Sequence, residues 1–574
     1  MSIQETFPEQ RSAALDTLLA ELGQGESVWA ATPLARRREL LAQLHTLTGQ
    51  HAQAWVDAAA QIKGLPADSA LLGEEWLSGP YAVLNSLAAL MDSVKALEAG
   101  RSPVDGFAFG RAPGNRVTVK GLPHTVFDRI LLSGFTAEVW MPPGVDETTV
   151  RERAGLAERE PTVTHGIGVV LGAGNISSIP VLDVIYELYA NNRVVVLKLN
   201  PITDPLLPVF TQIFAPLIDL GVLRIVTGGA DVGGYLVHHA NVAHVHMTGS
   251  AVTHDAVVFG TGPEGAQRKA ENRPLLSKEI TSELGGVSPT IVLPGPWSKA
   301  DLRFQAEHLV TQRLHNGGYN CVAGQVAIIS SDWAQKDEFL AQVRAALTRA
   351  PGRPAYYPGS DQRVAGALEA YPNAERLGPD QGRVLVRPET VEDREYLLNT
   401  ECFAPVLGVI ELPGSGRQFL DAAVTTANDD FVGTLGINLI ALPSTLKELG
   451  ADFEAALARL RYGTIAVNAW TGVGFATPTA SWGAFPGHTI DDVQSGIGVV
   501  HNALLLENPE RTVVRGPFRP SPRSLLNREL SISPRPPWFV TNRTAAGTAR
   551  AMTEFGARPG WARLPKIFAS ALRG

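Results

Sequence analysis

The stretch that decides the fold is GIGVVLGAGNISSIPVLDVIYELYANNRVVVLKL, residues 166–199. Two short apolar runs, GIGVVL and VVVLKL, flank a segment with helical spacing, VLDVIYELYANN. Two apolar strands joined by a helix are typical of a βαβ unit, in which the strands are parallel. The stretch therefore predicts a parallel sheet with helices on its faces.

The same alternation continues downstream. LRIVTG (223–228) and VAHVHM (242–247) predict two more strands, each preceded by a helix. We expect the first of these helices to begin with Asp204 as N-cap and Pro205 in its first turn. A second alternating region, which includes PTIVL (289–293) and VAIIS (326–330), predicts a second α/β unit.

Ligands of such sheets bind beyond the carboxyl ends of the strands. Gly172, Lys198 and Thr248 fall at those ends. The glycines after the first strand do not have G-x-G-x-x-G spacing, and no Walker A sequence occurs. The glycine-rich turn is therefore not expected to be an ordinary phosphate-binding loop.

One of the two cysteines lies in a run of small and polar residues. The segment HNGGYNCVAGQ, residues 315–325, contains Cys321 among glycines that allow close approach. A thiolate is a strong nucleophile where neighbouring N–H groups hold the sulfur ionised. A small apolar filler is the other interpretation, because free cysteine is often buried. The segment alone leaves both interpretations open.

A carboxylate lies upstream, in TSELGGVSP (281–289), as Glu283. Four further segments keep a fixed order with these two: GAGNISSIP (172–180), VVVLKLNP (194–201), MTGS (247–250) and ECFAPV (401–406). The six segments resemble the aldehyde dehydrogenase superfamily, over residues 161–500. The most specific parts are Glu-Leu-Gly-Gly, Asn-x-Gly-x-x-Cys and Glu-x-Phe-x-Pro.

The resemblance implies three catalytic residues. Cys321 would attack the aldehyde carbonyl, and the side chain of Asn175 with the backbone N–H of Cys321 would stabilise the developing oxyanion. Glu283 would be the base that activates water to clear the resulting thioester. A turn residue is the alternative for Asn175, and a cap of the glycine turn is the alternative for Glu283.

The resemblance also implies a nicotinamide cofactor, NAD or NADP. It assigns Lys198 to the adenosine ribose, Ser250 to the pyrophosphate, Glu401 to the nicotinamide ribose and Phe403 to packing near the nicotinamide. Gly249 and Leu284 complete the expected cofactor-binding set. Cys402 is expected to be structural, and no metal site is expected.

Two departures bear on the cofactor. Many NAD-preferring relatives carry a glutamate three positions after the lysine, where this chain has Pro201, so NADP stays open. His254 stands where the family often has glycine, which would alter the approach of the cofactor. A solvent-facing side chain is the other interpretation of His254.

The expected fold class is α/β, with a Rossmann-like cofactor domain, a second α/β catalytic domain, oligomerisation strands and a C-terminal extension. We place the N-terminal helices and cofactor domain at 1–284 and the catalytic domain at 285–490. Residues 491–516 return to the cofactor domain and supply an oligomerisation strand, with TVVRGPF (512–518) expected as an edge strand stopped by proline. Residues 517–574 form a basic, proline-rich extension that the family usually lacks.

Composition narrows the setting. The content of hydrophobic residues, 45%, is that of a globular protein, and two cysteines cannot form a disulfide framework. The start has no secretory pattern, and no apolar run is long enough to span a membrane. We expect a cytoplasmic location and no membrane partner.

Charge is spread unevenly. The net charge is −8, yet residues 511–574 hold twelve Arg or Lys against two Glu. Such a segment binds either nucleic acid or an acidic protein surface, and we favour an acidic partner subunit because no nucleic-acid-binding signature accompanies the charge. The resemblance implies a homodimer or homotetramer.

The expected activity is NAD(P)-dependent oxidation of an aldehyde to a carboxylic acid through a Cys321 thioester. A coenzyme-A-acylating or acyl-reducing relative is the alternative enzyme, although such relatives generally lack the glutamate at Glu283. A non-catalytic assembly or binding homologue is the third interpretation. We expect an apolar aldehyde tunnel lined by aromatic side chains at Tyr319, Trp470, Phe475 and Trp482.

Overall fold

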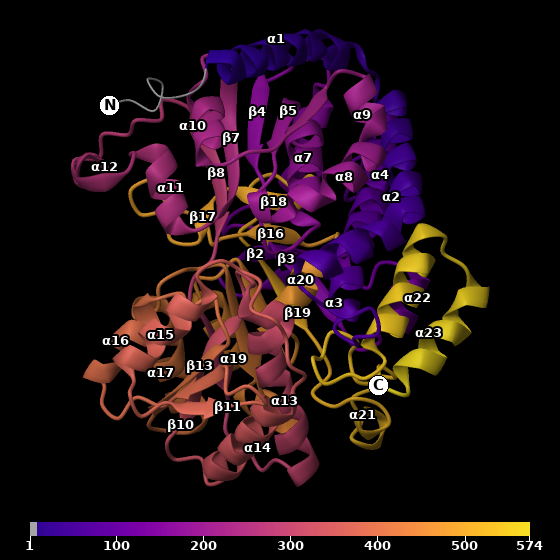
Figure 1. Ribbon diagram of the computed structural model, residues 1–574. Coiled ribbons are helices and arrows are strands. Elements are labelled where there is room, and N and C mark those ends of the chain that lie inside the picture. The colour runs from indigo at the N-terminus through magenta and orange to yellow at the C-terminus, as the bar shows by residue number, and fades with distance from the viewer. Residues whose placement is uncertain (1–8) are drawn as a thin grey trace.

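Six strands form the sheet in the upper part of the molecule (Figure 1). The computed structural model describes residues 9–574. The sheet order is β17-β8-β7-β4-β5-β6, and only β17 is antiparallel to its neighbour. The bounds are β4 Ile167–Leu171, β5 Val194–Lys198, β6 Leu223–Val226, β7 Val242–Gly249, β8 Glu279–Leu284 and β17 Gly496–Ile497. The predicted parallel sheet is confirmed, and strand order reverses at β4.

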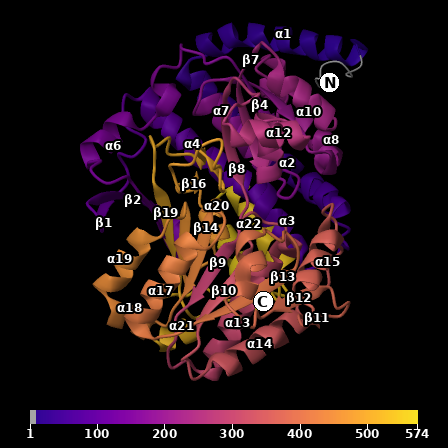
Figure 2. The same cartoon turned by 90° about the vertical axis from the view of Figure 1, so that its left-hand side faces the viewer.

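Helices pack on this sheet and share one apolar core with it. Helix α1 lies across its top in both ribbon views (Figures 1 and 2). The helices are α1 Glu9–Ala31, α2 Leu34–Ile62, α4 Ala82–Glu98, α7 Ile179–Tyr189, α8 Leu207–Ile213, α9 Ala215–Asp219, α10 Ala230–His238 and α11 Ala251–Val258. Helix α12 Gly262–Ala270 packs beside α11 and adds no residue to this core.

The helix start expected at Asp204 is wrong. The chain after β5 forms a 3-10 turn, η4 Pro201–Leu206, whose N-cap is Asn200. The Asn200 side chain accepts a hydrogen bond from the Ile202 N–H. Asn and Asp cap equally well, so the earlier cap wins and Asp204 lies inside the turn.

The second sheet has eleven strands, in the order β1-β2-β3-β19-β15-β14-β9-β10-β13-β12-β11. Parallel strands occupy its centre and antiparallel strands its two ends. Its bounds are β1 Phe109–Ala112, β2 Arg116–Leu122, β3 Thr136–Trp140, β9 Ser288–Val292, β10 Gly324–Ser330, β11 Glu375–Leu377, β12 Arg383–Val386, β13 Val406–Leu412, β14 Gly436–Ile440, β15 Thr464–Val467 and β19 Arg511–Arg515.

Strand β19 is not an edge strand, so that expectation is wrong. It pairs with β15 on one side and with β3 on the other. Proline stops a strand only from the point where it stands, and Pro517 lies two residues beyond the end of β19. The strand therefore joins the N-terminal β1–β3 meander to the parallel strands.

The remaining elements surround this sheet and the junction between the sheets (Figure 2). They are α3 Leu72–Trp76, η2 Leu77–Tyr81, α5 Val126–Leu131, α6 Glu147–Arg153, η3 Leu156–Arg159, α13 Lys299–Leu314, η5 His315–Gly318, α14 Lys336–Arg349, α15 Ser360–Ala370, η6 Glu392–Arg394, α16 Glu395–Asn399, α17 Gly416–Asp429, α18 Pro443–Leu449, α19 Ala451–Arg459, α20 Thr471–Ala476, β16 Ser481–Gly483 and β18 Val499–Asn502. Among residues 9–574, no helix has the length and apolar character that a membrane span requires.

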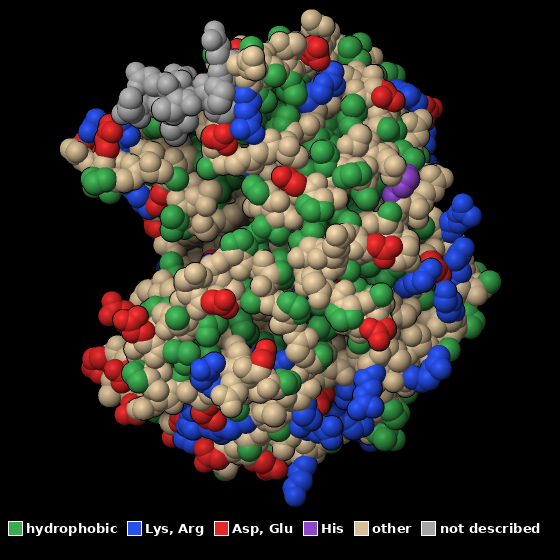
Figure 3. Space-filling view, viewed as in Figure 1, with side chains coloured by type: hydrophobic (Ala, Val, Ile, Leu, Met, Phe, Trp, Pro, Cys, Tyr) green, Lys and Arg blue, Asp and Glu red, His purple; other side chains and the backbone are tan. Residues whose placement is uncertain are grey.

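Residues 517–574 fold back on their own chain. They contain α21 Arg523–Leu526, α22 Ala545–Ala557, η7 Trp561–Arg563 and α23 Leu564–Ala571, shown in yellow in Figure 1. Arg519 and Arg523 both pair with Asp301, at 2.8 and 2.9 Å. Basic residues expected to meet a partner subunit thus meet acidic residues of α13. Others of them remain on the surface over α22 and α23 (Figure 3).

We predict that Asp301→Asn loosens the extension. Asp301 is almost fully buried, and its loss leaves Arg523 without its anion and Arg519 with Glu529 alone, so the change should cost about 3 kcal/mol of unfolding free energy. Urea unfolding and limited proteolysis of residues 517–574 measure the effect. Arg543→Gln, on an exposed arginine of the same extension, is the matched control. Equal stability of both variants would contradict the prediction.

Candidate active site

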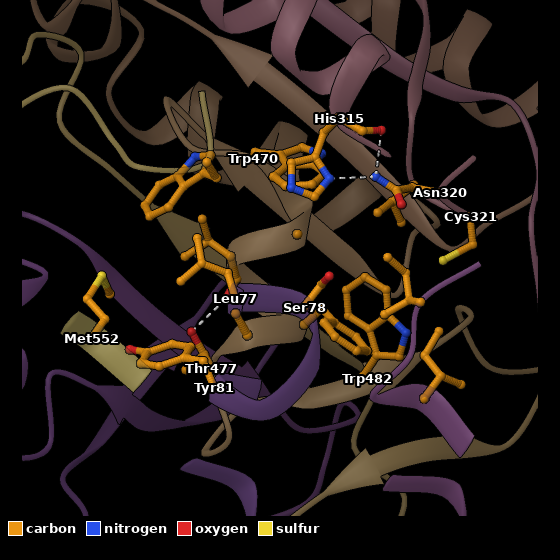
Figure 4. A pocket seen from close by; sticks show the side chains of 18 of the residues that line it. Leu77, Ser78, Tyr81, His315, Asn320, Cys321, Trp470, Thr477, Trp482 and Met552 are labelled. Atoms are coloured by element: carbon orange, nitrogen blue, oxygen red, sulfur yellow. Dashed lines mark hydrogen bonds between the residues drawn. The ribbon is translucent and has the colours of Figure 1, made fainter. Parts of the chain in front are cut away.

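Cys321 lies between α13 and β10, at the end of a tight turn. The turn η5 contains Asn316 and Gly317 with φ values of 55° and 70°, and Gly318 follows at 84°. The Cys321 side chain is half-buried and faces a cavity (Figure 4). Burial, followed by the charge of Glu283, raises the pKa of the Cys321 thiol well above its usual value. The sulfur therefore rests as a thiol and requires a base to become a nucleophile.

Glu283 is a carboxyl group next to Cys321. It lies near the end of β8, is fully buried, and neither carboxylate oxygen has a hydrogen-bond partner of normal geometry among residues 9–574. Burial raises its pKa to about 7, although the nearby Cys321 thiol favours the charged form. A carboxyl group that titrates near neutrality can both accept and release a proton.

Asn175 lies in the loop after β4. It lies against residues 315–321, which are called the nucleophile turn because Cys321 ends them. Its Nδ2 donates to the Tyr319 carbonyl at 2.9 Å, and its own carbonyl accepts from Asn316 Nδ2 at 3.1 Å. An amide group carries two N–H donors, so one remains after the bond to Tyr319. The structure thus brings Asn175 and the Cys321 turn together.

A buried charge network holds this turn from the N-terminal side. Lys63 Nζ donates to Glu75 Oε1 and to Asn316 Oδ1, both at 2.9 Å. The Asn316 backbone N–H donates to Glu74 Oε2 at 2.9 Å, and Arg353 pairs with the same carboxylate. Sequence reasoning missed this network. The adjacent Glu74 and Glu75 in an otherwise apolar helical stretch were the available signal.

The expected cofactor residues fall into two groups. Lys198 ends β5, Gly249 ends β7, and Ser250 caps α11 by accepting from the Thr253 N–H at 3.2 Å. The carboxyl ends of β5 and β7 lie on either side of the carboxyl end of β4. They face the side of the molecule where Figure 3 shows a hollow between its upper and lower halves. Leu284 ends β8, next to Glu283.

Glu401 and Phe403 form the second group, close to the nucleophile. A Cβ at Gly285 would lie 1.9 Å from Glu401 Oε1, so only glycine admits this carboxylate. Burial raises the pKa of Glu401 to about 7, while Arg313 acts in the opposite direction. Phe403 packs on Tyr357, with ring centroids 4.9 Å apart. A buried Glu401 Oε1 without a partner among the described residues fits a hydroxyl-bearing ligand.

His254 is not solvent-facing, so that interpretation is wrong. Its side chain is fully buried one turn into α11, with Asp255 Oδ1 at 3.7 Å as its ionic neighbour. Burial lowers its pKa. The described residues include no cluster of side chains that could hold a metal ion.

The cavity in front of Cys321 is apolar and holds about 100 Å³. Trp470, Phe475 and Trp482 line it as expected. Tyr319 does not, because its ring turns away and its hydroxyl bonds Ser360 Oγ at 2.7 Å. Cys402 is fully buried elsewhere, as expected of a structural cysteine.

His315 is the titratable group on the cavity wall besides Cys321 and Tyr81. Asn320 Nδ2 donates to its Nδ1 and to its carbonyl, each at 3.1 Å, so the ring proton lies on Nε2 (Figure 4). Burial lowers the pKa of His315 to about 4, which leaves the ring neutral at pH 7. The described lining contains no Asp, Glu, Lys or Arg.

A parallel sheet with ligand-binding residues at its strand ends, joined to a mixed sheet that carries a cysteine opposite a buried glutamate, defines the class of aldehyde dehydrogenase-like α/β proteins. The family model described as "Aldehyde dehydrogenase family" matches residues 145–483, more than half of the chain. The chain belongs to this family.

Individual relatives are distant. A "Probable aldehyde dehydrogenase" of Streptomyces coelicolor is 27% identical over 364 residues, 58% of this chain and 64% of the relative. A "D-glyceraldehyde dehydrogenase (NADP(+))" of Thermoplasma acidophilum is 25% identical over 43% of this chain and 49% of the relative. The chain thus spans less than two thirds of the curated relatives it matches.

Solved structures share the fold. The Pseudomonas syringae aldehyde dehydrogenase C, as a mutant complexed with NAD+ and octanal, has a TM-score of 0.58 and 19% identity, over 89% of this chain and 90% of that one. An indole-3-acetaldehyde dehydrogenase with NAD+ has a TM-score of 0.57 and 18% identity, over 88% of both chains. The predicted fold class is confirmed.

We predict that the network below the nucleophile turn is sensitive to single changes. Lys63→Met leaves Glu75 buried without its cation and should cost about 3 to 5 kcal/mol of unfolding free energy. The double variant Lys63→Met/Glu75→Leu removes both charges and should cost clearly less. Urea unfolding measures Lys63→Met, Glu75→Leu and the double variant. If the loss in the double variant equals the sum of the losses in the two single variants, the prediction is contradicted.

Proposed function

We propose that this protein oxidises an aldehyde to a carboxylic acid with NAD or NADP, through a thioester on Cys321. The observation that carries the proposal is the placement of the Cys321 thiol beside the buried Glu283 carboxylate, at the end of an apolar cavity. A non-catalytic binding protein would have no need for a carboxylate left buried and unpaired, because such a group is costly.

The first step forms a carbon–sulfur bond. Glu283 takes the thiol proton as Cys321 Sγ attacks the carbonyl carbon, and the carbonyl oxygen becomes negative in the resulting thiohemiacetal. The second N–H of Asn175 and the backbone N–H of Cys321 stabilise that oxygen. One such donor contributes about 3 to 4 kcal/mol to transition-state stabilisation.

The second step removes the acyl group from Cys321 Sγ. Loss of hydride from the carbon would convert the thiohemiacetal into a thioester, and a nicotinamide held by Lys198, Ser250 and Glu401 would supply the hydride acceptor. Glu283 releases to solvent the proton that it took from the thiol, and then removes a proton from water as that water attacks the thioester carbon. The carboxylic acid leaves, and the proton returns to the sulfur.

The lining favours an apolar aldehyde. Two Geobacillus relatives are named 1-pyrroline-5-carboxylate dehydrogenase, and a carboxylate-bearing substrate normally meets a cation. The described wall of this cavity has no Lys or Arg, and its histidine is neutral. We therefore do not carry the substrate of those relatives over to this chain.

Replacement of the two reacting groups tests the mechanism. Cys321→Ala should abolish formation of reduced cofactor from a panel of aliphatic and aromatic aldehydes with NAD or NADP. Glu283→Gln should lower the rate by about 10² to 10⁴-fold. Because the base works as a carboxylate and its pKa is about 7, wild-type kcat/KM should rise as the pH passes through about 7.

Product analysis separates the alternatives. Free acid formed without coenzyme A supports the proposal. Product that appears only as an acyl-coenzyme A would favour the acylating alternative, and turnover that survives in Cys321→Ala would contradict the covalent mechanism.

Asp204 supports NAD over NADP. Its Oδ1 is buried without a partner among residues 9–574, and its charge acts on Lys198. A carboxylate beside this lysine can accept from the ribose 2'-hydroxyl and repel a 2'-phosphate. Asp204 would then take the role of the glutamate that Pro201 replaces.

We predict that Asp204→Asn reduces the preference of the protein for NAD over NADP. Loss of one charged hydrogen bond should weaken NAD binding by about 10 to 100-fold, while NADP binding improves. Titration of tryptophan fluorescence with each dinucleotide gives both Kd values without turnover. Asp219→Asn, on an exposed aspartate of α9, is the control. An unchanged ratio of the two Kd values in Asp204→Asn would remove the assignment.

A homodimer or homotetramer and a cytoplasmic location stay predictions. Sizing of the purified chain by light scattering tests the first of them.

A further inference from the structure

We infer that the C-terminal extension, residues 517–574, is a specificity element that forms the far wall of the aldehyde cavity of its own chain and selects aldehydes with an apolar chain or ring. The inference rests on the proposed function for the name of the substrate. Trp538 and Met552, both outside the matched family segment, line the same cavity as Cys321.

The extension is anchored on both sides of Trp538. Before it, Arg519 makes two hydrogen bonds to Asp301, at 2.9 and 2.8 Å. After it, the Phe539 ring stacks on Phe304 and His308, with centroids 5.2 and 5.4 Å away. These contacts fix the backbone next to Trp538, so its indole is presented to the cavity as a set part of the fold.

Helix α22 presents Met552 in the same way. A Cβ at Gly73 would lie 2.7 Å from the Ala545 carbonyl carbon, so α22 and α3 touch through their backbones. Phe555, one turn beyond Met552, packs edge to face on Phe127 at 5.1 Å. The segment that follows α3 supplies Leu77 and Tyr81 to the cavity, so α22 rests on part of the wall that it completes.

The side chains of this wall are uncharged, so the wall disfavours a charged substrate. Figure 4 shows Met552 beside Tyr81, at the end of the cavity away from Cys321. Trp538 and Leu132 line a neighbouring pocket together with Met552, which places them at the same end. A thioether and aromatic faces pack against alkyl chains and rings. The cavity holds about 100 Å³, so the side chains of its wall limit the size of the substrate group that fits.

Alkylation of Cys321 tests the wall without cofactor or turnover. The full-length protein is treated with iodoacetamides whose N-alkyl chains grow from two to ten carbons, and peptide mass spectrometry follows the labelling of Cys321. Met552→Ala and Trp538→Ala should raise the relative rate with long chains at least about tenfold, and Met552→Trp should lower it by a similar factor. Arg550→Gln, on an exposed arginine of the same helix that does not line the cavity, should keep the wild-type profile.

The kcat/KM values for n-alkanals of rising length should shift in the same order. If the wall variants, Arg550→Gln and the wild type all share one chain-length profile, the inference is overturned. Thermal unfolding verifies that each variant is folded. If the wall variants change how the alkylation rate depends on chain length but no aldehyde is oxidised, the proposed function is contradicted and the inference about the wall is supported. If the wall variants oxidise aldehydes with the same chain-length preference as the wild type, the inference about the wall is contradicted and the proposed function is supported.

Discussion

The turn that carries Cys321 depends on a buried charge network in which Lys63, paired with Glu75, and Glu74 both bind Asn316. Asn316 and Gly317 have a left-handed backbone, which for asparagine is stable only where neighbours hold it. Glu74 holds the Asn316 N–H and Lys63 holds its side chain. The N-terminal helices, outside the matched family segment, therefore determine where Cys321 points.

The chemistry arises where the two sheets meet. Glu283 belongs to β8 of the six-stranded sheet, and Cys321 precedes β10 of the eleven-stranded one. Neither group is tuned by a strong ion pair at the site. Burial raises the pKa of both, which leaves a thiol beside a carboxyl group that is half ionised near neutral pH. A proton can then move between them with little change in net charge.

Local pattern was sufficient to predict the parallel strands β4 to β7, and the order of the motifs was sufficient to predict the family. The catalytic roles of Cys321 and Glu283 stay predictions. Contacts between distant segments were not accessible in this way. The pairing of β19 with β3, the burial of His254 and the rotation of Tyr319 toward Ser360 depend on partners far along the chain. Hydrophobic spacing marks a buried face but does not say what covers it, which is why Trp538 and Met552 were missed.

The location of the cavity wall also bears on how such a protein can diversify. The proposed nucleophile, base and cofactor-binding residues lie between residues 175 and 403, whereas part of the cavity wall lies beyond residue 517. Substitutions in the extension can reshape the accepted chain without disturbing the reacting groups. The residues that set the substrate range and the residues that carry out the reaction thus lie in different parts of one chain, and each set can vary independently of the other.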